Sequence, residues 1–234
     1  MTAKIPLVLC PGLLCDAALW RHQIENLADI ADITVGDFTI DDSLPGMASR
    51  LLATAPERFA LAGLSMGGYV AQEIIRQAPE RVTRLALLDT SARADTPEQT
   101  KRRRDLMDLA GRGRFRGVTP QLMPLLIHPD RLEDEPLTQA IMAMAENVGP
   151  EAFLRQQTAI AARPDGRGDL AGIACPTLVL CGRQDRLTPV EVNVEIAEGI
   201  PGADLVILGD CGHMTTMERP EATTAAMRVW LTER

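Results

Sequence analysis

The stretch ALAGLSMGGYVAQ, residues 60–72, places one serine, Ser65, between two glycines that each lie two positions away. A third glycine, Gly68, follows directly after the second. An apolar run precedes the serine, and a helix-like run follows it. This pattern predicts either a nucleophile held on a tight strand-to-helix turn or a glycine-rich connection between two buried elements.

The glycines favour the nucleophile. A turn from a buried strand directly into a helix strains the backbone of the serine and brings the two elements so close that neighbouring side chains must be tiny. Gly63, Gly67 and Gly68 meet that requirement. With only four serines and 18 glycines in the chain, this spacing is expected by chance about 0.02 times. Ser65 is therefore predicted to present its hydroxyl at a helix N-terminus, where unpaired N–H groups favour developing negative charge.

Short, continuous apolar runs recur along the chain, as is typical of strands buried on both faces of a parallel sheet. They span residues 5–10, 31–38, 58–63, 84–89, 176–182 and 203–209. Helical patterns separate them at residues 16–28, 47–55 and 66–78, and the last helix is expected to carry Ala222, Ala226, Val229 and Trp230 on its apolar stripe. The alternation predicts an α/β fold with a mostly parallel, doubly wound sheet.

The segment between residues 94 and 173 interrupts this alternation. Its patterns are helical only, over residues 97–110, 119–126, 137–147 and 150–162. It is far longer than an ordinary crossover between strands. We therefore predict a core formed by residues 1–93 and 174–234, with residues 94–173 inserted as a helical cap over the carboxyl ends of the strands.

The charge and hydropathy of the 234-residue chain exclude several classes of function. A formal net charge of −8 disfavours binding to nucleic acid or to an anionic membrane. The basic runs KRRR (101–104) and RGRFRG (112–117) are interpreted as a solvated surface of the cap. No apolar run approaches the roughly 18 residues of a membrane helix, and the first one is too short for a signal peptide. We expect a cytoplasmic protein with a small-molecule substrate; the pattern leaves its oligomeric state open.

The five cysteines show no paired zinc-type spacing. They are Cys10, Cys15, Cys175, Cys181 and Cys211. In a reducing compartment they are interpreted as small core residues or free thiols. Reactive thiols at Cys15 and Cys211 remain an alternative, because both lie beside segments assigned to the site below. No metal or cofactor is expected.

A serine hydroxyl needs a base to become a nucleophile, and the chain has three histidines. His213 directly follows the last predicted strand, on a loop at the same edge of the sheet as Ser65. His22 lies in a helix near the start of the chain, and His128 lies in the predicted cap. His213 is therefore the predicted general base.

The base in turn needs an acid that fixes its tautomer and stabilises the imidazolium. Asp185 lies on a short loop after the strand over 176–182 and completes the chain order Ser, Asp, His. Asp210, three residues before the histidine, and Asp89, at the end of another strand, are alternatives. We predict Asp185 as the acid and Asp89 as its backup.

Two N–H donors are expected to hold an oxyanion. One is the amide of Met66, directly after the serine. The other lies in the loop CPGLLCD (10–16) after the first strand, where Gly12 leaves the backbone unobstructed. Leu13 is the preferred donor there, and Leu14 is the second candidate.

These segments resemble the α/β-hydrolase superfamily, in particular its small, capped, esterase-like members. The resemblance rests on four motifs in order: LVLCPGLLCDAALW, LAGLSMGGYVAQEIIRQAPERVTRLALLDTSA, PTLVLCGRQDRLTPVEV and GDCGHMTTMERPE. It covers nearly everything outside the cap. The family often has His-Gly where this chain has Pro11-Gly12, a difference that leaves a backbone donor intact. The resemblance implies that the cap shapes the substrate pocket.

Residues and resemblance together predict a carboxylesterase-like serine hydrolase that cleaves an ester through an acyl-enzyme intermediate. An enol-lactonase, a hydrolase of C–C bonds or a perhydrolase would use the same residues, and a non-catalytic binding protein is an alternative from a different class. Apolar residues of the cap are interpreted either as the wall of a pocket for an apolar substrate group or as core packing. They are Leu106, Met107, Leu122, Met123, Leu125, Met142 and Met144.

Overall fold

The computed structural model describes residues 3–233, which form one six-stranded sheet flanked by helices. The strands are β1 (Ile5–Cys10), β2 (Ala31–Val35), β3 (Phe59–Leu64), β4 (Val82–Leu88), β5 (Thr177–Gly182) and β6 (Asp204–Leu208). Their order is β2-β1-β3-β4-β5-β6, and all neighbours pair in parallel. β2 lies on one side of β1, and the chain then crosses to the other side to form β3 and the strands after it. The sheet is therefore doubly wound, as predicted.

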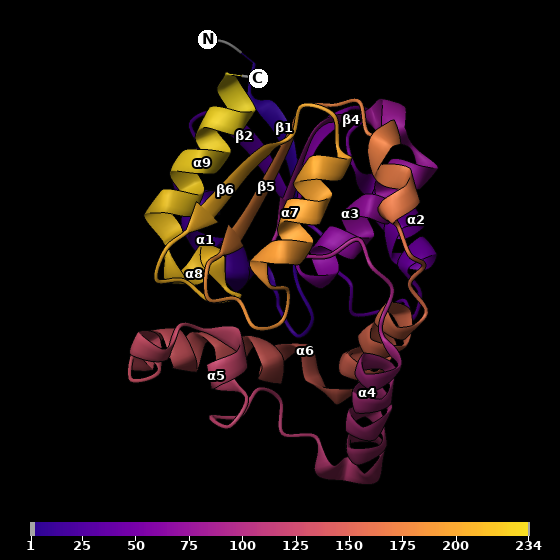
Figure 1. The fold of residues 1–234 in the computed structure, drawn as a ribbon, viewed down its shortest axis with the longest axis vertical. Coiled ribbons are helices and arrows are strands. Elements are labelled where there is room, and N and C mark those ends of the chain that lie inside the picture. Colours follow the sequence, from indigo (N-terminus) through magenta and orange to yellow (C-terminus); the bar gives the residue numbers. More distant parts are fainter. Residues whose placement is uncertain (1–2, 234) are drawn as a thin grey trace.

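Helices cover both faces of this sheet (Figure 1). Those outside the segment 94–173 are η1 (Ala17–Trp20), α1 (Arg21–Leu27), α2 (Leu44–Thr54), α3 (Met66–Gln77), η2 (Pro79–Arg81), α7 (Val190–Gly199), α8 (Thr215–Glu218) and α9 (Pro220–Thr232). One layer holds α1, α8 and α9, and the other holds α2, α3 and α7. Each layer buries its own apolar cluster against the sheet, since successive strand residues point to opposite faces.

Local signals set most helix boundaries within a few residues of the predicted ones. The Asp16 side chain accepts the amide of Ala18 and caps the first helical segment, whose first turn is a 3₁₀ turn. Ser43 caps α2 through the amide of Gly46, so this helix begins three residues before the predicted start. The predicted stripe of α9 is only partly right: Trp230 is buried and Ala226 packs against the core, but Ala222 and Val229 are exposed. The helix also buries Thr223, Thr224, Met227 and Leu231.

The segment 94–173, called the helical insertion from here on, contains no strand among its described residues. Its elements are α4 (Pro97–Leu109), the π-helical turn η3 (Ala110–Arg114), α5 (Met123–Leu126), η4 (Pro129–Arg131), α6 (Glu135–Ala161) and η5 (Arg167–Gly172). In Figure 1, α4, α5 and α6 lie beyond the arrowheads of the strands, which mark their carboxyl ends. The helix predicted over 119–126 is shorter than expected. The two predicted over 137–147 and 150–162 form one run that leaves helical geometry at Gly149.

No helix among residues 3–233 is both long enough and apolar enough to cross a bilayer.

Candidate active site

Ser65 lies on the turn between β3 and α3, with φ of 55° and ψ of −115°. A positive φ is costly for a residue with a Cβ, and such strain clusters at functional sites. The turn is also crowded: a Cβ on Gly63 would lie 2.2 Å from the carbonyl oxygen of Gly67, and one on Gly67 would lie 1.9 Å from that of Cys10. Both obstacles are backbone atoms. The turn therefore requires glycine at each of these two positions.

Gly68 makes room for a contact that supports the turn. A Cβ on Gly68 would lie 2.4 Å from Thr90 Oγ1. That hydroxyl donates a hydrogen bond of 2.8 Å to the carbonyl oxygen of Ser65. The turn is thus tied to the chain segment that follows β4.

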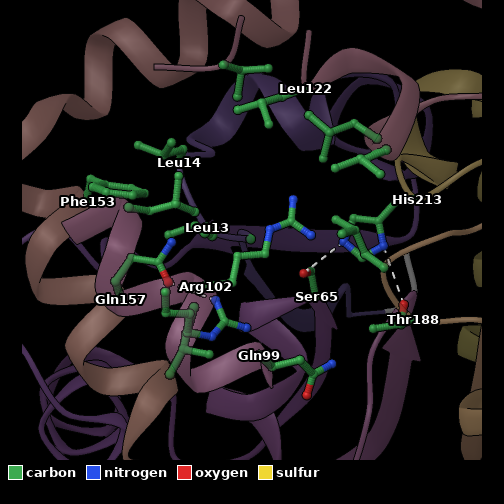
Figure 2. Close-up of a pocket in the computed structure, with 18 of the residues that line it drawn as sticks. Leu13, Leu14, Ser65, Gln99, Arg102, Leu122, Phe153, Gln157, Thr188 and His213 are labelled. Carbon is green, nitrogen blue, oxygen red and sulfur yellow. Dashed lines mark hydrogen bonds between the residues drawn. The ribbon is translucent and has the colours of Figure 1, made fainter. Parts of the chain in front are cut away.

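Ser65, His213 and Asp185 form one continuous hydrogen-bonded chain. His213 Nε2 lies 2.9 Å from Ser65 Oγ, as Figure 2 shows, and His213 Nδ1 lies 2.8 Å from Asp185 Oδ2. The three residues follow β3, β6 and β5, respectively. Because these strands are parallel, their carboxyl ends share one edge of the sheet, and the loops meet there.

Hydrogen bonds and charge keep Asp185 ionised although it is only 5% exposed. Its Oδ1 accepts the amides of Leu187 and Thr188 at 2.8 and 3.0 Å, and its Oδ2 accepts the Thr188 hydroxyl at 2.6 Å. Burial opposes the negative charge. The charge of His213 and these hydrogen bonds outweigh burial and hold the pKa of Asp185 below its ordinary value.

The pKa of His213 is shifted in the opposite direction. Burial, with 3% of the residue exposed, disfavours its charged form. The attraction of Asp185, strengthened by their hydrogen bond, outweighs burial and raises the pKa of His213 above its ordinary value. With the Nδ1 proton shared with the carboxylate, Nε2 is the nitrogen that accepts the Ser65 hydroxyl proton.

The two other candidate acids lie elsewhere. The carboxylate of Asp89 is fully buried and accepts hydrogen bonds from the amide of Gly182 and the hydroxyl of Thr215. Burial and the nearby charge of Asp185 raise its pKa well above the ordinary value. The side chain of Asp210 is exposed and pairs with Arg219 at 3.4 Å. Neither carboxylate is hydrogen-bonded to the histidine.

The two remaining histidines take part in packing and capping. His22 Nδ1 lies 2.7 Å from the hydroxyl of Thr224, so it joins α1 to α9. His128 Nδ1 accepts the amide of Asp130 at the start of η4. Neither lines the cavity above Ser65.

Glu218, which the sequence reasoning missed, fixes the loop that carries His213. Its buried carboxylate accepts the amides of Gly212 and Met214, on either side of the histidine, at 2.9 and 3.2 Å. It also accepts the amide of His128 in the helical insertion at 2.6 Å. Burial raises the pKa of Glu218 despite these three donors. The sequence gives no sign of this role, because buried glutamates are rare and the polar segment MERPE (217–221) does not indicate burial.

The backbone amides near Ser65 differ in their partners. Among the described residues, the amides of Leu13 and Met66 donate to no acceptor, whereas the amide of Leu14 donates to Gln156 Oε1 at 3.0 Å. Gln156, on α6, also donates to the carbonyl oxygen of Phe38 at 3.1 Å. It therefore holds the loop after β1 at Leu14, which has a positive φ of 59°. The amide of Leu13, the preferred donor, is thus available, and that of Leu14, the second candidate, is occupied.

A cavity of about 590 Å³ lies above Ser65 and His213. Three of the seven apolar residues singled out in the insertion, Leu106, Leu122 and Leu125, line it. The four methionines of that set do not, and Met123 and Met144 belong to the buried core.

Two arginines of the KRRR run, Arg102 and Arg103, also line this cavity. Arg102 is exposed, as the interpretation of that run as a solvated surface predicts, whereas Arg103 is half-buried; the cavity is the feature that the interpretation did not include. Gln99, Arg102, Arg103 and Leu106 share one helical face by their spacing, but the sequence does not indicate that this face is the one turned to the site.

Cys15, the one cysteine among the described residues that line the cavity, is not activated. Burial raises the pKa of the Cys15 thiol to about 12, so it stays protonated at neutral pH. Burial also raises the pKa of Cys211 far above the ordinary value for a thiol. Among residues 3–233, no group of three or more His, Cys, Asp or Glu side chains is arranged to hold a metal ion.

The sequence matches the model of the alpha/beta hydrolase family over residues 7–226. The chain belongs to this family. The fold and the family predicted from the sequence are therefore confirmed.

The chain is similar over nearly its whole length to several known hydrolases. It is 31% identical to a thermophilic esterase from Thermogutta terrifontis, with a TM-score of 0.88 over 99% of this chain and 90% of that chain. It is 25% identical to the enol-lactonase from Burkholderia xenovorans LB400, with a TM-score of 0.88 over 98% and 92% of the two chains. It is also 30% identical to a pimeloyl-(acyl-carrier protein) methyl ester esterase from Nitrosomonas europaea, over 92% and 91% of the two sequences. These are enzymes of the hydrolase class, the class predicted for this chain.

Proposed function

We propose that the protein is a serine hydrolase that cleaves a carboxylic ester through an acyl-enzyme intermediate. The observation that carries the proposal is the hydrogen-bonded chain from Asp185 through His213 to Ser65. The cavity above Ser65 supports it, because a substrate carbonyl has room to reach the hydroxyl. The esterases among its relatives support the same reaction class.

In the first half of the reaction, Ser65 is the nucleophile. Its Oγ attacks the ester carbonyl carbon while its proton moves to His213 Nε2. Asp185 holds the imidazole in the required tautomer and stabilises the imidazolium that forms. The tetrahedral intermediate then collapses, and His213 gives its proton to the departing alcohol.

In the second half, water replaces the alcohol. His213 removes a proton from a water molecule, which attacks the acyl-enzyme carbonyl. The second tetrahedral intermediate collapses as the bond between Ser65 Oγ and the acyl carbon breaks, and His213 returns its proton to Oγ and releases the acid. In both halves the negative oxygen is held by the amides of Leu13 and Met66. The contact between Gln156 and Leu14 keeps the loop that carries the first of these donors in place.

The helical insertion acts in this proposal as the cap that closes the cavity. It supplies both apolar walls and basic residues of the lining. The cytoplasmic location expected from the composition stays a prediction.

Hydrolysis of an enol-lactone is the second candidate, favoured by the full-length similarity to the enol-lactonase. A lactone is a cyclic ester, so the same residues would open it through the same intermediates. A panel of open-chain esters and enol-lactones assayed with one preparation separates the two, and the higher kcat/KM identifies the preferred class.

The test of the reaction class is hydrolysis of p-nitrophenyl butyrate by the parent, Ser65→Ala and Ser49→Ala. We expect Ser65→Ala to lose about 10⁴-fold or more in kcat. Ser49 lies on α2, where its hydroxyl contacts Gln77, so the Ser49→Ala control keeps the parental rate. A fluorophosphonate should label the peptide that contains Ser65. Parental activity in Ser65→Ala would overturn the proposal.

A further inference from the structure

The face of helix α4 that lines the cavity changes from polar to apolar along the helix. Gln99, Arg102 and Arg103 line it from the first half of the helix, and Leu106 and Leu109 line it from the second half. Spacings of three and four residues place all of them on one helical face. One part of the cavity is therefore polar and basic, while the remainder is mainly apolar.

This basic part has an excess of positive charge. Five arginines and no aspartate or glutamate are among the described residues that line the cavity. Arg93 is paired with Glu195 at 2.8 Å. Arg103 and Arg163 share the single carboxylate of Asp95, at 2.6 and 2.7 Å. The cluster of Arg103, Arg163 and Asp95 therefore keeps one unit of net positive charge.

Arg102 adds a second unit. Among residues 3–233, its side chain has no hydrogen-bond or ion-pair partner. Of the five arginines that line the cavity, only Arg116, on the loop after η3, shares this property. Figure 2 shows the Arg102 side chain extending into the cavity that Ser65 and His213 border. Its planar guanidinium thus offers all its N–H donors to a bound molecule.

We propose that Arg102 binds a carboxylate of the substrate, so that the preferred esters carry a carboxylate a few carbon atoms from the bond that is cleaved. The inference rests on the proposed function and names its substrate class. The planar fork of a guanidinium matches two carboxylate oxygens, and charge-assisted pairs of this kind are among the stronger hydrogen bonds.

The rest of the cavity fits the remainder of such a molecule. Leu122, Leu125 and Phe153 provide an apolar wall for a methylene chain. The positive charge is also local, since the whole chain carries a net charge of −8. The site therefore suits a small molecule with one anionic end better than a polyanion, which the remaining surface repels.

The experiment compares two substrates that differ only in charge: methyl hydrogen adipate and the methyl ester of adipic acid monoamide. The quantity measured is the ratio of their kcat/KM values. We expect the parent to favour the acid about tenfold or more, and this ratio to fall about tenfold to a hundredfold in Arg102→Gln. Methyl hydrogen succinate and suberate, each with its monoamide ester, give the preferred distance between the carboxylate and the ester.

Arg104→Gln is the matched control. Arg104 lies on the same helix and carries the same charge, but it does not line the cavity. Its variant should keep the parental ratio. Arg102→Lys should restore part of the preference for the acid, because it restores the charge without the planar fork.

Direct binding separates recognition from turnover. Methyl hydrogen adipate is titrated calorimetrically into Ser65→Ala and into Ser65→Ala/Arg102→Gln, and we expect the dissociation constant to rise about tenfold or more in the second protein. Equal ratios in the parent, Arg102→Gln and Arg104→Gln would overturn the inference, as would a parent that favours the amide. The proposed function is tested separately, because p-nitrophenyl butyrate carries no carboxylate.

Discussion

The edge of the sheet that carries Ser65 and the helical insertion that faces it are built in different ways. At the sheet edge, His213 and Asp185 are 3% and 5% exposed and are fixed by several hydrogen bonds each. In the insertion, α4 buries none of its residues, and Arg102 reaches into the cavity without a protein partner. The difference separates two tasks: the edge holds reacting groups at fixed distances, and α4 offers side chains that can change without disturbing the core.

The largest expected effect follows from breaking the hydrogen-bonded connection between Asp185, His213 and Ser65 at the sheet edge. Asp185→Asn should lower kcat about 10⁴-fold in p-nitrophenyl butyrate hydrolysis, because an amide does not hold the required tautomer of His213. Asp89→Asn should lower it no more than about tenfold, since Asp89 bonds to Gly182 and Thr215 and not to the histidine. A larger loss at Asp89 would transfer the role of acid to that residue.

The next effect compares one substitution in both regions. Gly67→Ala places a Cβ 1.9 Å from the backbone oxygen of Cys10, and we expect the free energy of unfolding to fall by more than about 3 kcal/mol. Gly111→Ala, in the insertion, meets no atom within 4 Å, and it should change that free energy by no more than about 1 kcal/mol. Urea unfolding of both variants measures the difference. Similar losses would show that the two regions tolerate added volume equally.

A third prediction concerns the contact between the two regions. Glu218→Gln places an amide NH₂ against at least one of the three backbone donors that the carboxylate accepts. We expect a loss of about 1–3 kcal/mol in the free energy of unfolding, together with a lower kcat, because the loop of His213 loosens. Glu221 is exposed on α9, and Glu221→Gln is the control for the loss of charge. If the two variants behave alike, Glu218 does not position the loop.

The smallest expected effect is a displaced pH profile. Only neutral His213 accepts the serine proton, so kcat/KM should rise with pH through a midpoint above about 6.5, the ordinary histidine pKa. Burial lowers the pKa of His213, but the charge of Asp185 outweighs burial, and Asp185→Asn should therefore move the midpoint down. A parental midpoint at or below 6.5 would contradict the raised pKa.

The pKa shifts of His213 and Asp185 also determine how the stability of the folded protein depends on pH. The raised pKa of His213 contributes stability that is fully present below the pKa of the unfolded histidine and is lost as pH rises through the folded value. The lowered pKa of Asp185 contributes stability that is present above the pKa of the unfolded carboxyl and is lost as pH falls through the folded value. Their pairing is therefore most stabilising between the two unfolded values.

Much of the fold could be predicted because its signals are local. A continuous apolar run identifies a strand buried on both faces, and the six predicted runs differ from the observed strands by at most three residues at an end. The stripe of α9 was predicted only in part, because Trp230 is buried but Val229 is exposed, while threonines of that helix are buried. Hydropathy alone does not identify a threonine whose hydroxyl is satisfied by a nearby carbonyl, as that of Thr223 is by Thr215.

The sequence by itself determined the sheet, the order of its loops and the glycines of the turn at Ser65, since each depends on neighbours a few residues apart. Only the tertiary structure decided which aspartate meets His213, how Glu218 and Gln156 hold the loops of the site, and which face of α4 lines the cavity. Those outcomes depend on distances between segments far apart in the chain. Gln156 and Leu14, 142 residues apart, are joined by one hydrogen bond of 3.0 Å.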